Sequence, residues 1–231
     1  MAPFTASSII TTSSSIRVVS DKQLTLYRFR GSPFSHKIEL ALAEANAPTK
    51  LYEVDLFNKP EWFAEKINPT GKIPAITYGG PDVDPQDPSP VSEKLAESGV
   101  VLEFIADLYP DSGLCQKTLP FAPGVKESVE SLLKGIEAVQ ALLPESGEYA
   151  VEDAYTIADA TLIPWILWLK VTYEHELGKF APEEARKLKA ELHGPKFEKF
   201  MRYGQKMLER KTTQSTFDEA CISFIHQSIV F

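Results

Sequence analysis

The feature that most constrains the fold is a change in hydrophobic periodicity near residue 110. Before that point, short segments typical of strands are separated by segments with helical spacing. The expected strands are 24–30, 50–56, a stretch that ends at Tyr78, and 91–96. The helical segments that follow are 126–143, 156–177, 182–192 and 195–210. We therefore expect a mixed α/β domain followed by an all-helical domain.

The order of elements in the first half indicates how its strands pair. Helical spacing follows Ser32, and Asn46-Ala47-Pro48 ends that helix before the second strand. A strand, a helix and a strand in succession favour a parallel pair joined by a crossover helix. Further expected elements are a proline-rich loop at 81–90, a helix at 98–108 and a linker at 109–113. The predicted organisation is a flexible arm at 1–22, an α/β domain at 23–109 and a helical domain at 110–231.

The charge balance limits the partners of the chain. Lys and Arg total 24 against 32 Asp and Glu, which gives a formal net charge of −8 and a pI near 5.1. This balance argues against nucleic acid or an anionic membrane as a partner. It leaves room for a local basic pocket that binds a small anion.

The arm and the cysteines bear on localisation. The first 22 residues are rich in Ser and Thr without a continuous apolar run, which is not the pattern of a secretory signal. A transit peptide is the alternative, but only Arg17 is positive before Lys22; a short strand at 15–19 is a further alternative. Cys115 and Cys221 match no metal or redox spacing, which favours a cytoplasmic location.

Ser32-Pro33-Phe34-Ser35 lies where the first strand meets the first helix. Ser32 as the N-cap and Pro33 as the first helical residue would explain the pattern by helix capping alone. The functional alternative is that a hydroxyl at a helix N-terminus stabilises a bound anion or thiolate. A serine is too weak an acid to deprotonate a thiol, but it can donate a hydrogen bond to the thiolate.

Two further pieces point to a peptide-like anionic ligand. In Lys72-Ile73-Pro74 a cis proline would leave the Ile73 backbone free to pair with an extended ligand, and an ordinary turn proline is the alternative. At Glu97-Ser98, capping by Ser98 is the simple interpretation. The functional one is a helix N-terminus that binds a ligand carboxylate beside a Glu97 that binds an amine. Lys59 and Lys72 add cations.

The order and spacing of these pieces resemble the soluble glutathione transferases. The resemblance runs from Leu24 to Leu208 and includes SPFS, NPTGKIPAI and ESGVVLEFIADLYP. Tyr155–Leu162 is similar to the family's buried capping box, in which Thr156 and Asp159 would cap one another. Within the family, RFRGSPFSHKIELALAEA and the loop at 81–90 resemble the fungal-specific class A enzymes, which are relatives of bacterial lignin β-etherases.

The resemblance implies a thioredoxin-like N-terminal domain, an all-helical C-terminal domain and a homodimer. It implies glutathione as co-substrate, bound by Lys59, Lys72, the Ile73 backbone before a cis Pro74, Glu97 and Ser98. Ser32 matches the thiol-stabilising hydroxyl of serine-type members, and Ser35 is close enough to be the alternative. Because no cysteine occupies that place, mixed-disulfide chemistry is not expected. No metal is expected, since His36, His175, His193 and His226 share no ligand spacing.

The expected activity is conjugation of glutathione to small hydrophobic electrophiles, or reduction of peroxides with it. Candidate substrate contacts, for which core packing is the alternative, are Phe34, Phe121, Leu132, Ile136, Trp165 and Trp168. Three other functions stay open. They are a ligandin-type protein that binds aromatic and polyphenolic compounds, a β-etherase, and a transferase-like interaction module without catalysis.

Overall fold

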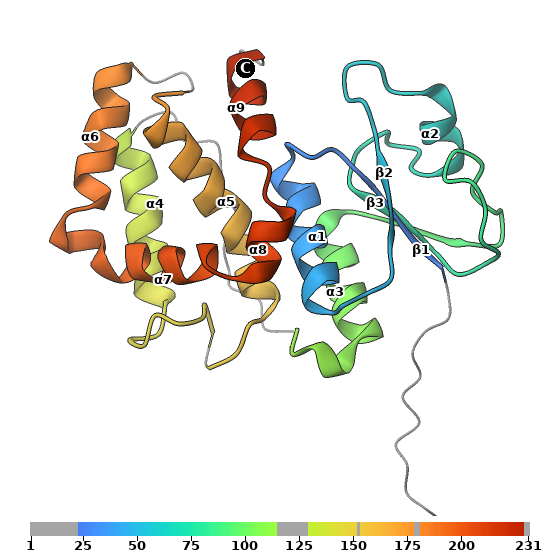
Figure 1. Ribbon diagram of the computed structural model, residues 1–231, viewed down its shortest axis with the longest axis horizontal. Coiled ribbons are helices and arrows are strands. Elements are labelled where there is room, and N and C mark those ends of the chain that lie inside the picture. The colour runs from blue at the N-terminus through green and yellow to red at the C-terminus, as the bar shows by residue number, and fades with distance from the viewer. Residues whose placement is uncertain (1–22, 115–128, 152, 178–180, 229–231) are drawn as a thin grey trace, which may run out of the picture.

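The computed structural model describes residues 23–114, 129–151, 153–177 and 181–228. The predicted arm with its alternatives, Cys115 and the substrate candidate Phe121 lie outside these residues. Figure 1 shows an α/β part on one side of the molecule and a group of helices on the other.

A four-stranded mixed sheet forms the centre of the α/β part. Its strands are β1 (Leu24–Arg28), β2 (Lys50–Glu53), β3 (Ala75–Tyr78) and β4 (Glu93–Ala96), in the order β2-β1-β3-β4. β1 pairs parallel with β2 and antiparallel with β3, and β3 pairs antiparallel with β4. The expected parallel pair with a crossover helix, α1 (Pro33–Glu44), is therefore confirmed.

Both faces of the sheet are covered. Leu24 and Leu26 of β1 belong to the main core, against α1 and α3 (Ser98–Leu108). Tyr27 points to the other face, where it packs with Phe63 of α2 (Glu61–Lys66). The proline-rich loop lies on this second face, because the Tyr27 hydroxyl donates to the Pro85 carbonyl at 2.7 Å. α1 and α3 thus lie between the sheet and the helical part (Figure 1).

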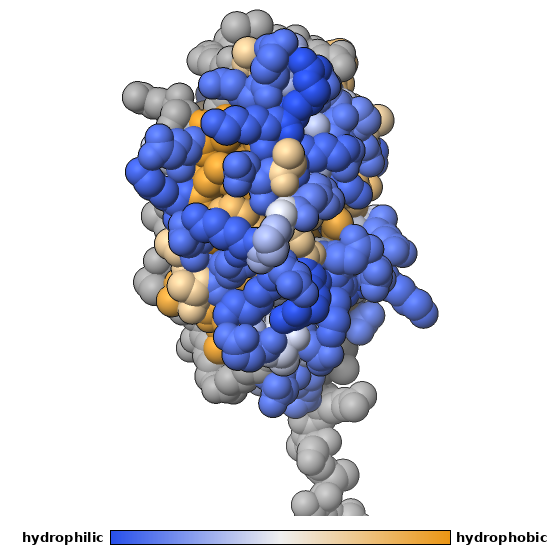
Figure 2. All heavy atoms as spheres, turned by 90° about the vertical axis from the view of Figure 1, so that its left-hand side faces the viewer, coloured by the Kyte–Doolittle hydropathy of each residue, from blue (hydrophilic) through white to orange (hydrophobic). Residues whose placement is uncertain are grey.

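The helical part contains four helices that the periodicity predicts. They are α4 (Val129–Leu142), α5 (Ile157–Glu174), α6 (Pro182–Leu192) and, after a 3-10 turn at Pro195–Phe197, α7 (Glu198–Leu208). The face of this part that lies far from the sheet is mostly hydrophilic, with a strip of apolar side chains among the hydrophilic ones (Figure 2). The expected thioredoxin-like domain and all-helical domain are confirmed.

Two helices follow that the sequence analysis does not predict. α8 (Lys211–Thr216) packs on α1 and α7, and α9 (Glu219–Ser228) packs on α5. The sequence of α8, KTTQST, carries no apolar periodicity, so local patterns do not reveal it. Its position is set by contacts with α1 that only the folded chain provides.

The capping box at the start of α5 forms as expected. The Thr156 hydroxyl accepts from the Ala158 amide at 3.2 Å, and the Asp159 carboxylate accepts from the Thr156 amide at 2.8 Å. Asp159 is fully buried and also accepts from the Ala150 amide at 2.7 Å and the Tyr203 hydroxyl at 3.0 Å. Burial raises the pKa of its carboxyl group. One side chain thereby holds together a loop, α5 and α7.

We expect Asp159→Ala to lower the free energy of unfolding by about 3 kcal/mol or more, because it leaves several buried donors without an acceptor. Tyr203→Phe is the matched control and removes only one donor, for an expected loss of about 1 kcal/mol. Urea unfolding followed by tryptophan fluorescence measures both. Equal losses in the two variants would contradict this role of Asp159.

Candidate functional site

The N-terminus of α1 is built by local sequence. Ser32 is the N-cap with φ of −86° and ψ of 122°, and Pro33 is the first helical residue, so the capping prediction is confirmed. The Ser32 hydroxyl accepts from the Ser35 amide at 3.4 Å and is half-buried. Within the described residues its hydrogen has no acceptor, and the first turn of α1 carries no acidic residue. This helix end therefore presents a free O–H donor and an uncompensated positive dipole to an anion.

Ser35 has different surroundings. It is fully buried, and its hydroxyl oxygen accepts from the Phe29 amide at 3.2 Å. Ser35 thus joins the start of α1 to the end of β1 and has no exposed surface to offer a ligand. Of the two serines that the sequence leaves open, the geometry favours Ser32 as the one that faces a ligand.

The loop before β3 contains the second predicted binding segment, Lys72-Ile73-Pro74. The Ile73–Pro74 peptide bond is cis, as expected. Asn68 holds the preceding turn, because its side-chain amide donates to the Lys72 carbonyl at 2.8 Å. Within residues 23–114, the Ile73 backbone makes no backbone hydrogen bond, so it is available to an extended ligand. Lys72 is exposed, and the Lys59 ammonium donates to the carbonyl of Gly71 in the same loop at 2.6 Å.

The start of α3 corrects one expectation. Ser98 is not the cap but the first helical residue, and Glu97 takes the cap position with φ of 65° and ψ of 106°. This left-handed backbone is uncommon for a residue other than glycine, and it leaves the Glu97 side chain exposed without capping α3. A Cβ added to Gly99 would meet nothing within 4 Å. The N-terminal amides of α3 therefore face open space beside a carboxylate.

The register of the sheet brings these distant pieces to one end. Tyr27 near the end of β1 lies opposite Ala75 at the start of β3, and Ala75 lies opposite Ala96 at the end of β4. The chain segments that lead to Ser32, come from the cis Pro74 and lead to Glu97 therefore meet at the same sheet end. Loops and helix starts at this end carry five of the predicted glutathione contacts. These are Lys59, Lys72, Ile73, Glu97 and Ser98.

Aromatic side chains meet where α1 faces α5. The Phe34 ring is 45% exposed and lies edge-on to Trp165 of α5, with ring centroids 5.6 Å apart and an interplanar angle of 84°. Trp168, one turn later, is half-buried. Leu132 is half-buried against the main core, and Ile136 lies inside that core at 6% exposure. The structure thus unites Phe34 with Trp165, and it gives Ile136 little surface for a substrate.

α9 covers the loop that precedes Ser32. A Cβ built on Gly31 would lie 1.5 Å from Cδ1 of Ile225, so this methyl group occupies the space that a side chain at residue 31 would need. Ile225 is 3% exposed. Arg30 pairs with Asp218 at 3.4 Å at the same junction. Sequence reasoning missed this element, although the apolar spacing of Ile222 and Ile225 is a helical signal.

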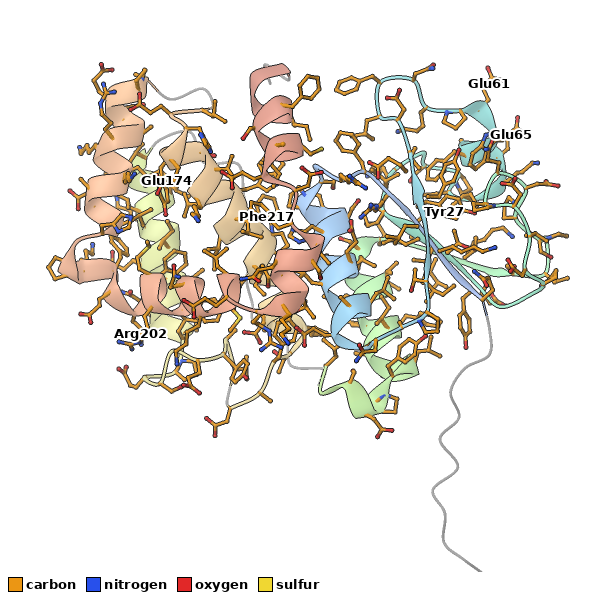
Figure 3. The ribbon with its side chains drawn as sticks, viewed as in Figure 1. Tyr27, Glu61, Glu65, Glu174, Arg202 and Phe217 are labelled. Carbon is orange, nitrogen blue, oxygen red and sulfur yellow. The ribbon has the colours of Figure 1, made fainter. Side chains whose placement is uncertain are left out.

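α8 is attached along the outer side of α1. Arg210 forms a two-pronged ion pair with Glu44, with nitrogen–oxygen distances of 3.1 and 2.7 Å. His36 Nε2 lies 2.9 Å from the Thr216 hydroxyl, and its ring stacks on Phe217 with centroids 6.4 Å apart. Phe217 lies between the helical part and α1 in Figure 3. Burial lowers the pKa of His36 to about 4, so the imidazole is neutral at neutral pH.

A separate cavity has no wall residue in common with the N-cap of α1 at Ser32. Its volume is about 680 Å³, and its walls include Arg28, Glu39, Phe217 and Asp218. The charged groups there pair with one another, since Arg28 binds Glu39 and Arg30 binds Asp218. These ion pairs neutralise much of the charge in the cavity wall, so we place no ligand there.

The described residues contain neither a metal-binding cluster nor a membrane-spanning helix. No group of three or more His, Cys, Asp or Glu side chains in this part of the chain could hold a metal ion. None of its helices is long and apolar enough to cross a membrane.

The fold and the site define a class: a thioredoxin-like domain with a cis proline and a helix N-terminus capped by Ser32, joined to an all-helical domain. Comparison with known proteins identifies the family. Residues 26–113 match the glutathione S-transferase N-terminal domain, and residues 122–190 match the glutathione S-transferase C-terminal domain. The chain belongs to the glutathione transferase family.

Individual relatives agree with this assignment. Glutathione transferase Omega 1C from Trametes versicolor is 37% identical with a TM-score of 0.81, covering 90% of this chain and 96% of its own. Omega 2S from the same organism, solved with 2,4-dihydroxybenzophenone, is 30% identical with a TM-score of 0.81, covering 90% of this chain and 100% of its own. The probable glutathione S-transferase DHAR1, cytosolic, of Oryza sativa subsp. japonica is 27% identical over 66% of this chain and 73% of its own.

The contact between α9 and Gly31 predicts a specific energetic coupling. Gly31→Ala should lower the free energy of unfolding by about 1–3 kcal/mol, because its new methyl group overlaps Ile225. In an Ile225→Ala background the same change should have little effect, since the space is then free. Gly99→Ala is the control, because a Cβ there meets nothing within 4 Å. Additive effects in a urea double-mutant cycle would show that α9 does not lie on Gly31.

His36 predicts a pH dependence of stability. Its pKa is 6.5 when unfolded and about 4 when folded, so the folded state binds fewer protons in between and stability falls as pH drops from 6.5 towards 4. Relative to His36→Gln, the wild type should lose about 2 kcal/mol between about pH 7.5 and about pH 5.

The free energy of unfolding of each variant must be compared with that of the wild type at the same pH. Burial raises the pKa of Glu39 to about 7, which gives an opposite slope that both proteins share. His175→Gln is the control, because that exposed imidazole pairs only with Glu219 at the surface. If the free energy of unfolding changed with pH in the same way in the wild type and in His36→Gln, a neutral buried His36 would be ruled out.

Proposed function

We propose that the protein is a serine-type glutathione transferase, in which the Ser32 hydroxyl and the N-terminus of α1 stabilise the thiolate of glutathione. The observation that carries this proposal is the sheet register, which gathers the segments of Ser32, Ile73–Pro74 and Glu97–Ser98 at one end of the sheet. Family membership supports glutathione-dependent chemistry. The exposed O–H of Ser32, against the buried one of Ser35, supports the choice of residue.

The thiolate is stabilised by two effects that act together. The Ser32 O–H donates a hydrogen bond to the sulfur, and the N-terminal end of the α1 dipole adds positive potential. Both favour the charged form, and each unit by which the thiol pKa falls corresponds to about 1.4 kcal/mol. The protein thus raises the thiolate fraction, while the nucleophile itself belongs to glutathione.

The rest of the peptide has matching partners. The Ile73 backbone pairs with the extended central part of glutathione in the manner of an added strand. The open N-terminus of α3 at Ser98 binds one carboxylate, and Glu97 binds the adjacent ammonium. Lys59 and Lys72 attract the second carboxylate. These pairings explain how a chain of net charge −8 can bind an anionic tripeptide.

The second substrate lies at the junction of α1 and α5. The bound thiolate attacks an electrophilic carbon, forming a carbon–sulfur bond while the leaving group departs with its electron pair. With a peroxide the thiolate attacks oxygen, the O–O bond breaks and the alkoxide leaves as the alcohol after protonation. A second glutathione then converts the resulting sulfenic acid into glutathione disulfide and water. Phe34 and Trp165 provide an aromatic surface for the electrophile, and Trp168 extends it. Ile225 of α9 closes the side next to Gly31.

A second candidate function is carriage of aromatic compounds with incidental catalysis. The exposed Phe34 ring favours it, and so does the relative that was solved with 2,4-dihydroxybenzophenone. Calorimetry with that compound, run beside turnover on chlorodinitrobenzene, separates the two. Tight binding together with negligible turnover would favour carriage over catalysis.

Several finer assignments belong to the same proposal. We infer membership of the fungal-specific class A, with β-ether cleavage as the variant activity, from the SPFSHKIELALAEA segment and the loop at 81–90. We also infer a homodimer, for which exposed Phe57 and Val100 provide apolar surface. A domain boundary after residue 109 follows from the end of α3, and a cytoplasmic location agrees with the cytosolic name of the Oryza relative.

Ser32→Ala tests the proposal against Ser35→Ala. The first variant should raise the pKa of the bound glutathione thiol by about one unit and lower kcat/KM about tenfold at neutral pH, because a charge-assisted hydrogen bond is lost. The second should leave the thiol pKa unchanged and lower the free energy of unfolding by about 1 kcal/mol. Ultraviolet absorbance of the thiolate across pH measures the first effect. An unchanged thiol pKa in Ser32→Ala would remove Ser32 from this role.

A further inference from the structure

Lys37 lies on the side of α1 that meets the helical domain. Phe34, three residues before it, contacts Trp165 of α5, and Glu44, seven residues after it, binds Arg210. Residues at these spacings share one face of a helix. Lys37 is therefore placed between two contacts that join the two domains, and it is half-buried there.

Among the described residues, the Lys37 ammonium has no anionic partner. Within the described part of the chain, no salt bridge of 4.0 Å or less reaches Lys37, and its pKa is lowered by burial alone. Glu44, an acidic residue on the same face of α1, is already bound by Arg210 and Thr212. A half-buried cation without a partner is costly unless a bound anion compensates for it.

The direction of the side chain brings this charge towards the aromatic pair. Side chains in a helix lean towards its N-terminus, so the long Lys37 chain extends back towards the turn of Phe34. Phe34 is 45% exposed, and its partner Trp165 is half-buried. A cation on the next turn of α1 after Phe34, whose ring packs on Trp165, fits a ligand that combines an aromatic ring with an acidic group.

We propose that Lys37 binds the acidic group of an aromatic acid, either a carboxylate or a phenolate, whose ring lies against Phe34 and Trp165. Lys37 thereby selects acidic over neutral aromatic compounds at the second-substrate site. This inference rests on the proposed function for the location of that site. It goes beyond that function by naming the chemical class of the compound.

The test compares 2-naphthoate with 2-naphthamide, which differ in charge but hardly in size. Calorimetry on the full chain should show about tenfold tighter binding of the naphthoate, the worth of one charge-assisted hydrogen bond. Lys37→Met should reduce this preference to less than twofold, and Lys37→Arg should retain it. Lys170→Met is the matched control, because it removes the same charge from a lysine that lies beside Phe200 and Met201 of α7.

Equal binding of the two compounds by the wild type would overturn the proposal, and so would a preference that survives in Lys37→Met. If Lys37→Met kept the preference for the naphthoate and only raised the pKa of the bound glutathione thiol, Lys37 would act on the thiol and not on the aromatic acid. Binding of S-methylglutathione is measured separately in every variant. Its absence counts against the proposed function, whereas the naphthoate preference is read without glutathione and counts only for or against Lys37.

Discussion

The packing of α1 between the sheet and the helical domain is the constraint on which the rest of the structure depends. Leu40 and Leu42 are buried in the main core, Phe34 meets α5, and Glu44 and His36 hold α8. Because α1 is fixed on both sides, its N-terminus cannot shift relative to the cis Pro74 or to α9. Catalytic groups that must be held to within a fraction of an ångström benefit from such an element. The same helix therefore carries both the domain interface and the proposed thiolate site.

Local signals account for most of the fold that the sequence predicts. α3 and α6 have the predicted bounds, because the signals that define each helix lie within its own segment. For α3 the signal is apolar spacing, and for α6 it is the initial Pro182. The Ser32–Pro33 cap and the cis Pro74 are likewise set by neighbouring residues or by a short motif. Their meeting at one sheet end is different, because it depends on which strand pairs with which. The family resemblance supplied that arrangement, and residue spacing alone did not.

The parts that escaped prediction are those decided by tertiary contacts. α8 is polar, and Arg210 and Thr212 attach it to Glu44. Glu97 rather than Ser98 occupies the cap of α3, because the chain leaving β4 takes a left-handed backbone that no local preference favours. Ser32 and Ser35 have the same hydroxyl, and only burial separates them. In each case the structure depends on a residue remote in sequence or on the conformation of the backbone, and neither can be recognised from the local sequence.

The distribution of charge bears on how an acidic chain could bind an anion at the proposed site. Many acidic groups are engaged elsewhere in ion pairs: Glu44 with Arg210, Glu39 with Arg28, and Asp218 with Arg30. The sheet end that carries the proposed site has instead the N-termini of α1 and α3 and lysines at positions 59 and 72, together with Glu97. At physiological salt, charges more than about 8 Å apart in solvent are largely screened, so the distant acidic residues do little to oppose this local field. Net charge therefore bears on long-range partners, whereas in the proposed site the few groups at the N-terminus of α1 would decide which small molecules bind.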